Sequence, residues 1–130
     1  MLVDSDVLIW HFRGLPRATQ RLDRLPRLTI SAATYFELLQ GMRNRAELMV
    51  VQKSLARRNM ERLPLTEAIT ERAAALMETW TLSHGLGMGD ALIAATALEH
   101  GLSLLTANVK HFSQIEDLKL ERFDPKVGAR

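Results

Sequence analysis

The chain has 130 residues, of which 47% are hydrophobic and 25% are charged, and its net charge at pH 7 is +2. This length and composition are typical of one folded domain, residues 1–130, and exclude an intrinsically disordered chain. The absence of cysteine excludes disulfides, thiolate metal sites and a thiol nucleophile; together with the lack of a basic, apolar leader it favours the cytoplasm. The longest apolar run, residues 91–98, is too short to cross a membrane, so no membrane association is expected.

Strand and helix signals alternate along the whole chain, with glycine, proline or a capping residue between them. In chain order, the expected elements are a strand at 2–3, helices at 6–13 and 17–27, a strand at 28–30, helices at 32–41 and 45–59, a strand at 62–65, helices at 66–83 and 90–100, and strands at 102–108 and 118–123. This alternation predicts an α/β fold, a three-layer α/β/α sandwich with a central parallel sheet of four or five strands. Ligands of such sheets bind beyond the carboxyl ends of the strands.

Three carboxylates occupy apolar or small surroundings in which a solvated surface position is awkward. They are Asp4 after "MLV", Glu37 in "AATYFELLQG" and Asp90 in "GLGMGDALIAATAL", and no Arg or Lys lies within four residues of any of them. Each has a purely local explanation: Asp4 or Asp6 as the N-cap of the following helix, Thr34-x-x-Glu37 as a capping box, and Asp90 as another N-cap.

The second explanation is that these acids converge, because all of them fall at or near strand-to-helix junctions. Like charges about 4 Å apart repel by roughly 4 kcal/mol per pair at an effective dielectric near 20. Either one carboxyl group then keeps a proton, or a cation lies between them. Oxygen ligands without cysteine favour a hard cation, Mg²⁺ with Mn²⁺ as a possible substitute, and such a site suits phosphate chemistry.

The acids stand in an order and spacing that resembles the PIN-domain ribonucleases and, within them, the VapC-type toxins of toxin–antitoxin systems. The segment "LVDSDVLI" resembles the first motif of the family, "ISAATYFELLQGM" the second, and "MGDALIAATALEHGLSLLTANVKHF" the third and fourth joined. The resemblance runs over most of the chain. No single segment is specific for the family, but the three segments in this order and at this spacing are.

The resemblance implies a Mg²⁺-dependent endoribonuclease that cleaves single-stranded RNA to 5′-phosphate products, forms a homodimer and is blocked by a cognate antitoxin. Carried over by position, Asp4 and Asp90 would be the principal metal ligands, and Glu37 would complete the acidic cluster and orient the attacking water. Thr106 would support the turn after the first strand by hydrogen bonding. We expect Asp6 to fix the loop or a water of the metal.

The chain departs from the family pattern after the fourth strand, where a further acid is common. Asn108 and His111 stand at the two positions concerned, so one well-held cation is expected and a second is in doubt. Asn108 is interpreted either as an acceptor for a water of the metal or as a turn residue in left-handed backbone. His111 is near the expected crevice and is interpreted either as a surface-turn residue or as a contact to a phosphate.

Two other functional classes remain open at this point. A haloacid-dehalogenase-like phosphatase also begins with strand-Asp-x-Asp, which would make Asp4 a covalent nucleophile and Asp6 a general acid. The only Lys between the second strand and Gly89 is Lys53, in mid-helix, and Glu37 would have no task, which weakens that interpretation. A non-catalytic nucleic-acid-binding module would explain the basic first half but leave the acids idle.

The basic residues are concentrated in residues 13–62, which carry eleven Arg or Lys against four Asp or Glu. Arg13, Arg17, Arg21 and Arg24 recur at three- or four-residue spacing. They are interpreted as the lining of an RNA path, as a solvated face, or as a contact surface for an acidic antitoxin.

Overall fold

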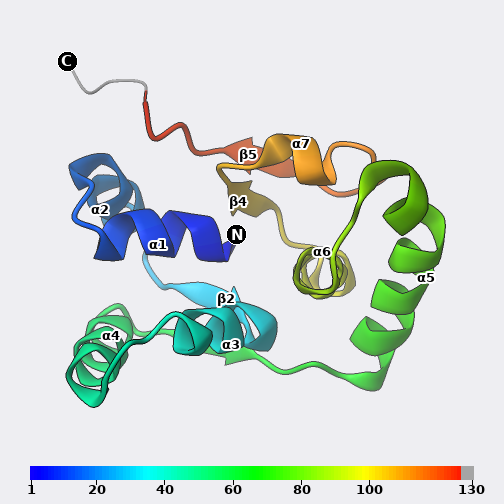
Figure 1. The fold of residues 1–130 in the computed structure, drawn as a ribbon. Helices are drawn as coiled ribbons and strands as arrows, with labels where there is room; N and C mark the ends of the chain where they lie inside the picture. The colour runs from blue at the N-terminus through cyan, green and yellow to red at the C-terminus, as the bar shows by residue number, and fades with distance from the viewer. Residues whose placement is uncertain (127–130) are drawn as a thin grey trace.

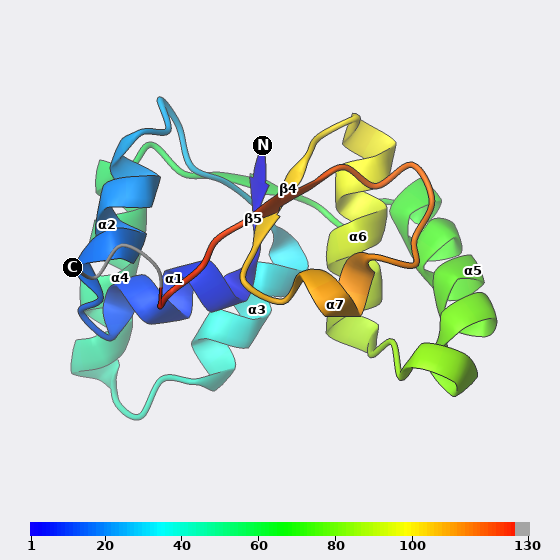
Figure 2. The same ribbon diagram turned by 90° about the horizontal axis from the view of Figure 1, so that it is seen from above.

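The computed structural model describes residues 1–126. Its elements are β1 (Leu2–Val3), α1 (Ser5–Phe12), α2 (Pro16–Asp23), β2 (Thr29–Ser31), α3 (Ala32–Gln40), α4 (Arg45–Arg57), β3 (Glu61–Leu63), α5 (Glu67–His84), α6 (Met88–His100), β4 (Leu104–Thr106), α7 (Val109–Phe112) and β5 (Leu120–Arg122). The strands lie between α1, α2 and α4 on one side and α5 and α6 on the other (Figures 1 and 2). This is the three-layer α/β/α arrangement that the alternating sequence pattern predicts.

The strands pair in parallel but form two hydrogen-bonded ladders rather than one continuous sheet. One ladder has the order β1-β4-β5, and the other joins β2 to β3. Strand β1 packs beside β2 without a ladder between them in the part of the chain that the structure describes. Leu2 pairs with Leu104 and Val3 with Leu105, so β1 and β4 end side by side. Asp4 and Ala107, the residues that follow these strands, therefore lie at one edge of the sheet.

The sheet is buried on both faces, and alternate residues of a strand belong to different cores. Leu2 and Leu104 pack into the core under α5 and α6, whereas Val3 and Leu105 pack into the core under α1, α2 and α4. All four side chains are fully buried. Continuous apolar strands such as these are typical of a parallel sheet covered by helices.

Local signals account for most helix boundaries. Ser31 caps α3 by accepting a hydrogen bond from Ala33 N, and Thr66 caps α5 by accepting one from Ile69 N. Gly85 and Gly101 end α5 and α6 in left-handed backbone, which glycine adopts without steric cost. Helix α2 begins at Pro16, because proline fits the first helical position, but it ends at Asp23, four residues before the expected end. Helix α6 begins at Met88, two residues before the expected start, and the short helix α7 was not expected. The other boundaries lie within two residues of expectation.

Helix α6 is the most enclosed helix of the described chain. Its residues from Ala91 to Ala97 are buried apart from the partly buried Leu92, and α6 packs most extensively against α5. Alanine on several faces lets neighbouring backbones approach closely, which allows α6 to pack against α3 as well as α5. No helix within residues 1–126 combines the length and the apolar character needed to cross a bilayer.

Two apolar residues of α5 give a matched test of this core. Ile69 is fully buried, whereas Leu82 is fully exposed. We expect Ile69→Ala to lower the free energy of unfolding by about 2–5 kcal/mol, because it leaves a cavity under α5. Leu82→Ala should change it by less than about 0.5 kcal/mol. Urea unfolding followed by circular dichroism measures both, and equal effects would contradict the packing described here.

Candidate active site

Asp4 lies at the junction of β1 and α1 and is almost completely buried, with 4% of its surface exposed. Its Oδ1 accepts a hydrogen bond from Ser5 N at 2.8 Å, so Asp4 is also the N-cap of α1. Its Oδ2 accepts a hydrogen bond from Thr106 Oγ1 at 2.8 Å. Asp4 is therefore both a helix cap and a member of a buried, hydrogen-bonded cluster.

The loop after β4 is tied to Asp6. Asp6 Oδ2 accepts hydrogen bonds from Ala107 N and from Asn108 Nδ2, both at 3.0 Å, and lies 3.3 Å from Thr106 Oγ1. Thr106 Oγ1 also accepts a hydrogen bond from Asn108 N at 3.0 Å. Asn108 has φ −107°, so the left-handed turn interpretation was wrong. Its amide donates to a carboxylate and links the ends of β1 and β4.

Glu37 reaches the same edge of the sheet from α3. Its Oε1 accepts a hydrogen bond from Ser5 Oγ at 3.1 Å, and the same hydroxyl lies 3.4 Å from Asp4 Oδ1. A Cβ atom on Gly89 would lie 2.9 Å from Glu37 Oε2, so a side chain at position 89 would displace this carboxylate from its present place. The capping-box interpretation of Glu37 was wrong, because Ser31 caps α3.

Asp90 comes from the first turn of α6. The N-cap of this helix is Gly87, so the interpretation of Asp90 as an N-cap was wrong. Asp90 Oδ2 lies 3.2 Å from Nδ1 of His111, a residue of α7 whose side chain is 60% exposed. His111 lies on the surface near the acids, as expected, but it lies in the helix α7 rather than in a turn, and its contact with Asp90 was not expected.

The carboxylates at this edge repel one another, and burial adds to the effect. Burial first, and then the negative charges of Asp6 and Asp90, raise the pKa of Asp4 to about 7, although hydrogen bonds from Thr106 and Ser5 act in the opposite direction. Burial also raises the pKa of Glu37, with smaller contributions from the charges of Asp90 and Asp6. Four acids from three separate segments therefore share one electrostatic environment.

The pKa values of the other two acids, Asp6 and Asp90, are raised as well. Burial raises the pKa of Asp6, and the hydrogen bond from Ala107 N partly offsets it. Burial likewise raises the pKa of Asp90, and the neighbouring His111 partly offsets it. No Arg or Lys within residues 1–126 forms an ion pair with any of the four acids. Apart from the contact of His111 with Asp90, the negative charge of the cluster is therefore not compensated by a basic side chain of the described chain.

The donor atoms fit a hard divalent cation that is held by few protein ligands. Among residues 1–126, no three His, Asp or Glu side chains form a ready-made ligand cage. Mg²⁺ commonly takes only one or two carboxylates and completes its octahedron with waters and substrate phosphates. Asp6 Oδ1 is buried without a hydrogen-bond partner, which leaves one oxygen of the cluster free to accept from such a water.

The structure brings together all six residues that the sequence analysis singled out: Asp4, Asp6, Glu37, Asp90, Thr106 and Asn108. The sequence analysis missed the link that Ser5 makes between Asp4 and Glu37, and the contact of Gly89 with Glu37. A small hydroxyl residue between two acids, and a glycine directly before a third, were the available signals.

Comparison with known proteins places this arrangement in a family. The model of the PIN domain matches residues 1–118. Ribonuclease VapC10 of Mycobacterium tuberculosis is 44% identical over 123 residues, which covers 92% of this chain and 90% of the relative. A chain of a toxin–antitoxin complex from Klebsiella pneumoniae is 30% identical, with a TM-score of 0.76 and coverage of 95% of this chain and 96% of that one.

A DNA-bound VapBC structure from Salmonella typhimurium has a TM-score of 0.80 at 22% identity, covering 93% of this chain and 96% of that chain, and supports the fold alone. The family model spans each acid of the cluster, from Asp4 to Asp90, and the loop after β4 as well. The chain therefore belongs to the PIN-domain family and, within that family, to the VapC-type proteins.

Proposed function

We propose that this protein is a Mg²⁺-dependent endoribonuclease that cleaves single-stranded RNA and acts as the toxin of a toxin–antitoxin pair. The observation that carries the proposal is the gathering of Asp4, Asp6, Glu37 and Asp90 at one edge of the sheet without an Arg or Lys partner in the described chain. Four neighbouring carboxylates are costly unless a cation or a proton neutralises them. The names of the relatives, a ribonuclease and a toxin–antitoxin complex, support the same activity.

In the proposed mechanism, Asp4 and Asp90 hold the cation, and Mn²⁺ is expected to substitute for Mg²⁺. A divalent cation at this place supplies Lewis-acid chemistry, since it neutralises charge on a phosphodiester and acidifies water. Glu37, half-buried and held by Ser5, orients the attacking water and accepts its proton. The expected products carry a 5′-phosphate and a 3′-hydroxyl group.

Asp6, Thr106 and Asn108 serve as positioning residues in this proposal. Their hydrogen bonds join the ends of β1 and β4, so they fix the direction of the Asp4 carboxylate. Such partners of metal ligands orient the ligand and tune its basicity.

The expected partners are an RNA substrate, a cognate antitoxin and a second copy of the chain in a homodimer, all in the cytoplasm. The similar structures are described as toxin–antitoxin and VapBC complexes, which supports an antitoxin partner. The phosphatase alternative is not retained, because the chain belongs to another family and Glu37 lies in the acid cluster.

The direct test is incubation of purified protein with single-stranded RNA in Mg²⁺, in Mn²⁺ and in EDTA. We expect cleavage with either metal and none with EDTA. Full cleavage in EDTA would overturn the metal-dependent mechanism, and tight RNA binding without cleavage under every condition would favour a binding module. Hydrolysis of a simple phosphate monoester with a trapped aspartyl-phosphate would restore the phosphatase hypothesis.

Thr106 gives a test of the positioning residues. Thr106→Val removes the hydroxyl that donates to Asp4 and accepts from Asn108, while side-chain volume is nearly kept. We expect RNA cleavage to fall by about 10–100-fold, since the metal ligand loses its orienting partner. Thr106→Ser should restore most of the rate because it restores the hydroxyl. Equal rates for Thr106→Val and wild type would show that this hydrogen bond does not position Asp4.

A further inference from the structure

A second charged feature lies outside the acid cluster, in a groove of about 680 Å³ between α2 and β5. Its basic lining consists of Arg17 and Arg21 of α2, Arg24 directly after α2 and Arg122 of β5, and Glu121 is the one acid of that lining. The lining therefore carries a net charge of +3. A protein surface with this excess of arginine attracts polyanions.

The spacing of the arginines explains why they share one side of α2. Residues three and four apart on a helix are neighbours, so Arg17, Arg21 and Arg24 form one row. The only acid of α2, Asp23, points the other way and pairs with Arg58 at the end of α4. The helix thus separates its charges: the acid binds α4, and the arginines line the groove.

Little of this positive charge is neutralised within the described chain. Arg21 pairs with Glu121, and Arg17 Nε donates a hydrogen bond of 3.0 Å to the backbone oxygen of Asp124, which carries no charge. Within residues 1–126, Arg24 and Arg122 form no ion pair. Guanidinium groups that no acid occupies are available to bind phosphate oxygens in a bidentate manner.

The groove begins one strand away from the acid cluster. Arg122 is the residue of β5 paired with Thr106 of β4, and Phe123 N donates a hydrogen bond of 2.9 Å to Thr106 O. Thr106 in turn donates to Asp4. A polymer that crosses the edge of the sheet at Asp4 can therefore continue over β5 into the groove without leaving the surface.

We propose that the groove between α2 and β5 binds the backbone phosphates of single-stranded RNA beyond the position of cleavage. This inference rests on the proposed nuclease function, and it adds a contact that affects affinity for long RNA rather than the chemical step. Contacts to phosphates carry no sequence information, so the groove increases affinity for any single strand long enough to reach it.

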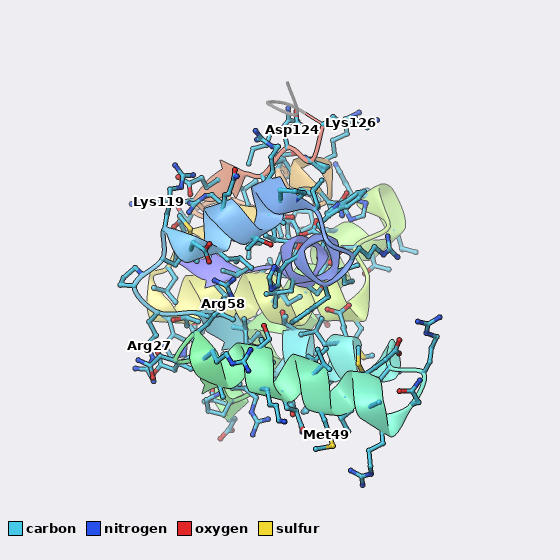
Figure 3. The ribbon with its side chains drawn as sticks, turned by 90° about the vertical axis from the view of Figure 1, so that its left-hand side faces the viewer. Arg27, Met49, Arg58, Lys119, Asp124 and Lys126 are labelled. Carbon is cyan, nitrogen blue, oxygen red and sulfur yellow. The ribbon has the colours of Figure 1, made fainter. Side chains whose placement is uncertain are left out.

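The surrounding face supports a polyanionic ligand. Viewed from the side of α2 and α4, Arg27, Arg58, Lys119 and Lys126 are all visible on this face, although they come from four different segments (Figure 3). Asp124 lies among them near the end of β5, and its Oδ1 accepts a hydrogen bond from Lys126 N. Arg27, Lys119 and Lys126 therefore add positive charge to this face, whereas Arg58 is paired with Asp23.

The test compares RNA binding by Arg24→Gln/Arg122→Gln with binding by Arg45→Gln/Lys53→Gln, both placed in an Asp90→Asn background to prevent cleavage. Arg45 and Lys53 of the control lie exposed on α4, and replacing both by Gln removes the same net charge. The probes are a labelled oligouridylate long enough to span both sites and a labelled tetranucleotide. For the long probe, we expect the Arg24/Arg122 variant to weaken binding about tenfold and to reduce the salt slope by roughly 1.4, that is about 0.7 for each lost phosphate contact.

The tetranucleotide should bind both variants equally, and the control pair should change binding of the long probe by less than about twofold. In an otherwise wild-type background, the Arg24/Arg122 variant should raise KM for long RNA and leave kcat unchanged. Unchanged affinity and salt slope for the long probe overturn the inference, as does a variant that weakens antitoxin binding but not RNA binding. Because binding is measured without cleavage, loss of the proposed nuclease activity and loss of the groove contact are distinguished.

Discussion

Replacing Asp90 or Asp4 by Asn should lower the rate of RNA cleavage by about a thousandfold. Each change removes one negative charge from the pair that is proposed to hold the cation, while the size of the side chain is kept. A metal ion supplies several kcal/mol of charge stabilisation in the transition state, and roughly 4 kcal/mol corresponds to a thousandfold in rate. Glu37→Gln should cost about a hundredfold, a typical loss for a general base.

Asp117→Asn is a matched control for these substitutions. Asp117 is exposed and has φ 66°, a left-handed conformation that asparagine also tolerates. The Asp117→Asn variant should therefore cleave RNA at the wild-type rate. Initial rates on one labelled RNA in Mg²⁺ give the comparison, and circular dichroism establishes that each variant is folded. Wild-type rates for both Asp4→Asn and Asp90→Asn would refute the proposed mechanism.

The second large effect is a gain of stability when the charge of Asp4 is removed in the absence of metal. Burial and the neighbouring acids raise the pKa of Asp4 from 3.8 to about 7, a shift that corresponds to roughly 4 kcal/mol. The folded state binds this proton more tightly than the unfolded state does. The contribution that protonation of Asp4 makes to the stability of the folded state is therefore complete below pH 4. It is lost progressively as the pH rises from about 4 to 7 and is absent above pH 7.

Asp4→Asn should consequently unfold at higher urea concentration than wild type at pH 8 in EDTA. We expect a gain of about 2 kcal/mol, which is less than the full value, because an asparagine oxygen keeps only part of the hydrogen bonding from Ser5 and Thr106. The difference should fall as the pH is lowered and reverse near pH 4, because Asp4 is neutral there in wild type and only the loss of hydrogen bonding in the variant, about 2 kcal/mol, remains. Addition of Mg²⁺ at pH 8 should reverse the order, since only wild type keeps both proposed ligands.

The pH series distinguishes this explanation from a general effect of the substitution. If Asp4→Asn were less stable than wild type at pH 8 in EDTA, the hydrogen bonds of the Asp4 carboxylate would outweigh its burial and its repulsion by the other acids. A stability difference that does not change between pH 4 and pH 8 would contradict the raised pKa of Asp4.

The order of elements was largely predictable because short-range rules determine it. Apolar runs such as residues 28–30, the capping hydroxyl of Ser31 and the glycines that end helices act within a few residues, so one sequence is enough to recognise them. The rule that parallel strands end at a shared edge accounts for Asp4, which follows β1. It does not account for Asp90, which lies in the first turn of α6 after another helix, or for Glu37, which lies in the second half of α3, so the expectation that all three stand at or near strand-to-helix junctions was wrong for Asp90. These acids lie at that edge in the structure.

The features that sequence analysis missed depend on contacts between distant segments. Ser5 bridges to Glu37 of α3, and His111 contacts Asp90 of α6, and neither spacing signals the pair. The start of α6 at Met88 was missed because glycines at positions 85, 87 and 89 indicated a loop. Packing against α5 and α3 holds Gly89 in the helix and leaves room for Glu37. Tertiary packing here overrides a weak local preference.

The most direct test of the central claim is an anomalous difference map from crystals grown with Mn²⁺. The account predicts one strong peak within coordination distance of carboxylate oxygens of both Asp4 and Asp90, with Glu37 close by. It also predicts that the peak disappears in Asp90→Asn crystals grown in the same way. A map with no peak at this edge of the sheet, or with Mn²⁺ bound only elsewhere, would contradict the claim that these acids form a metal site.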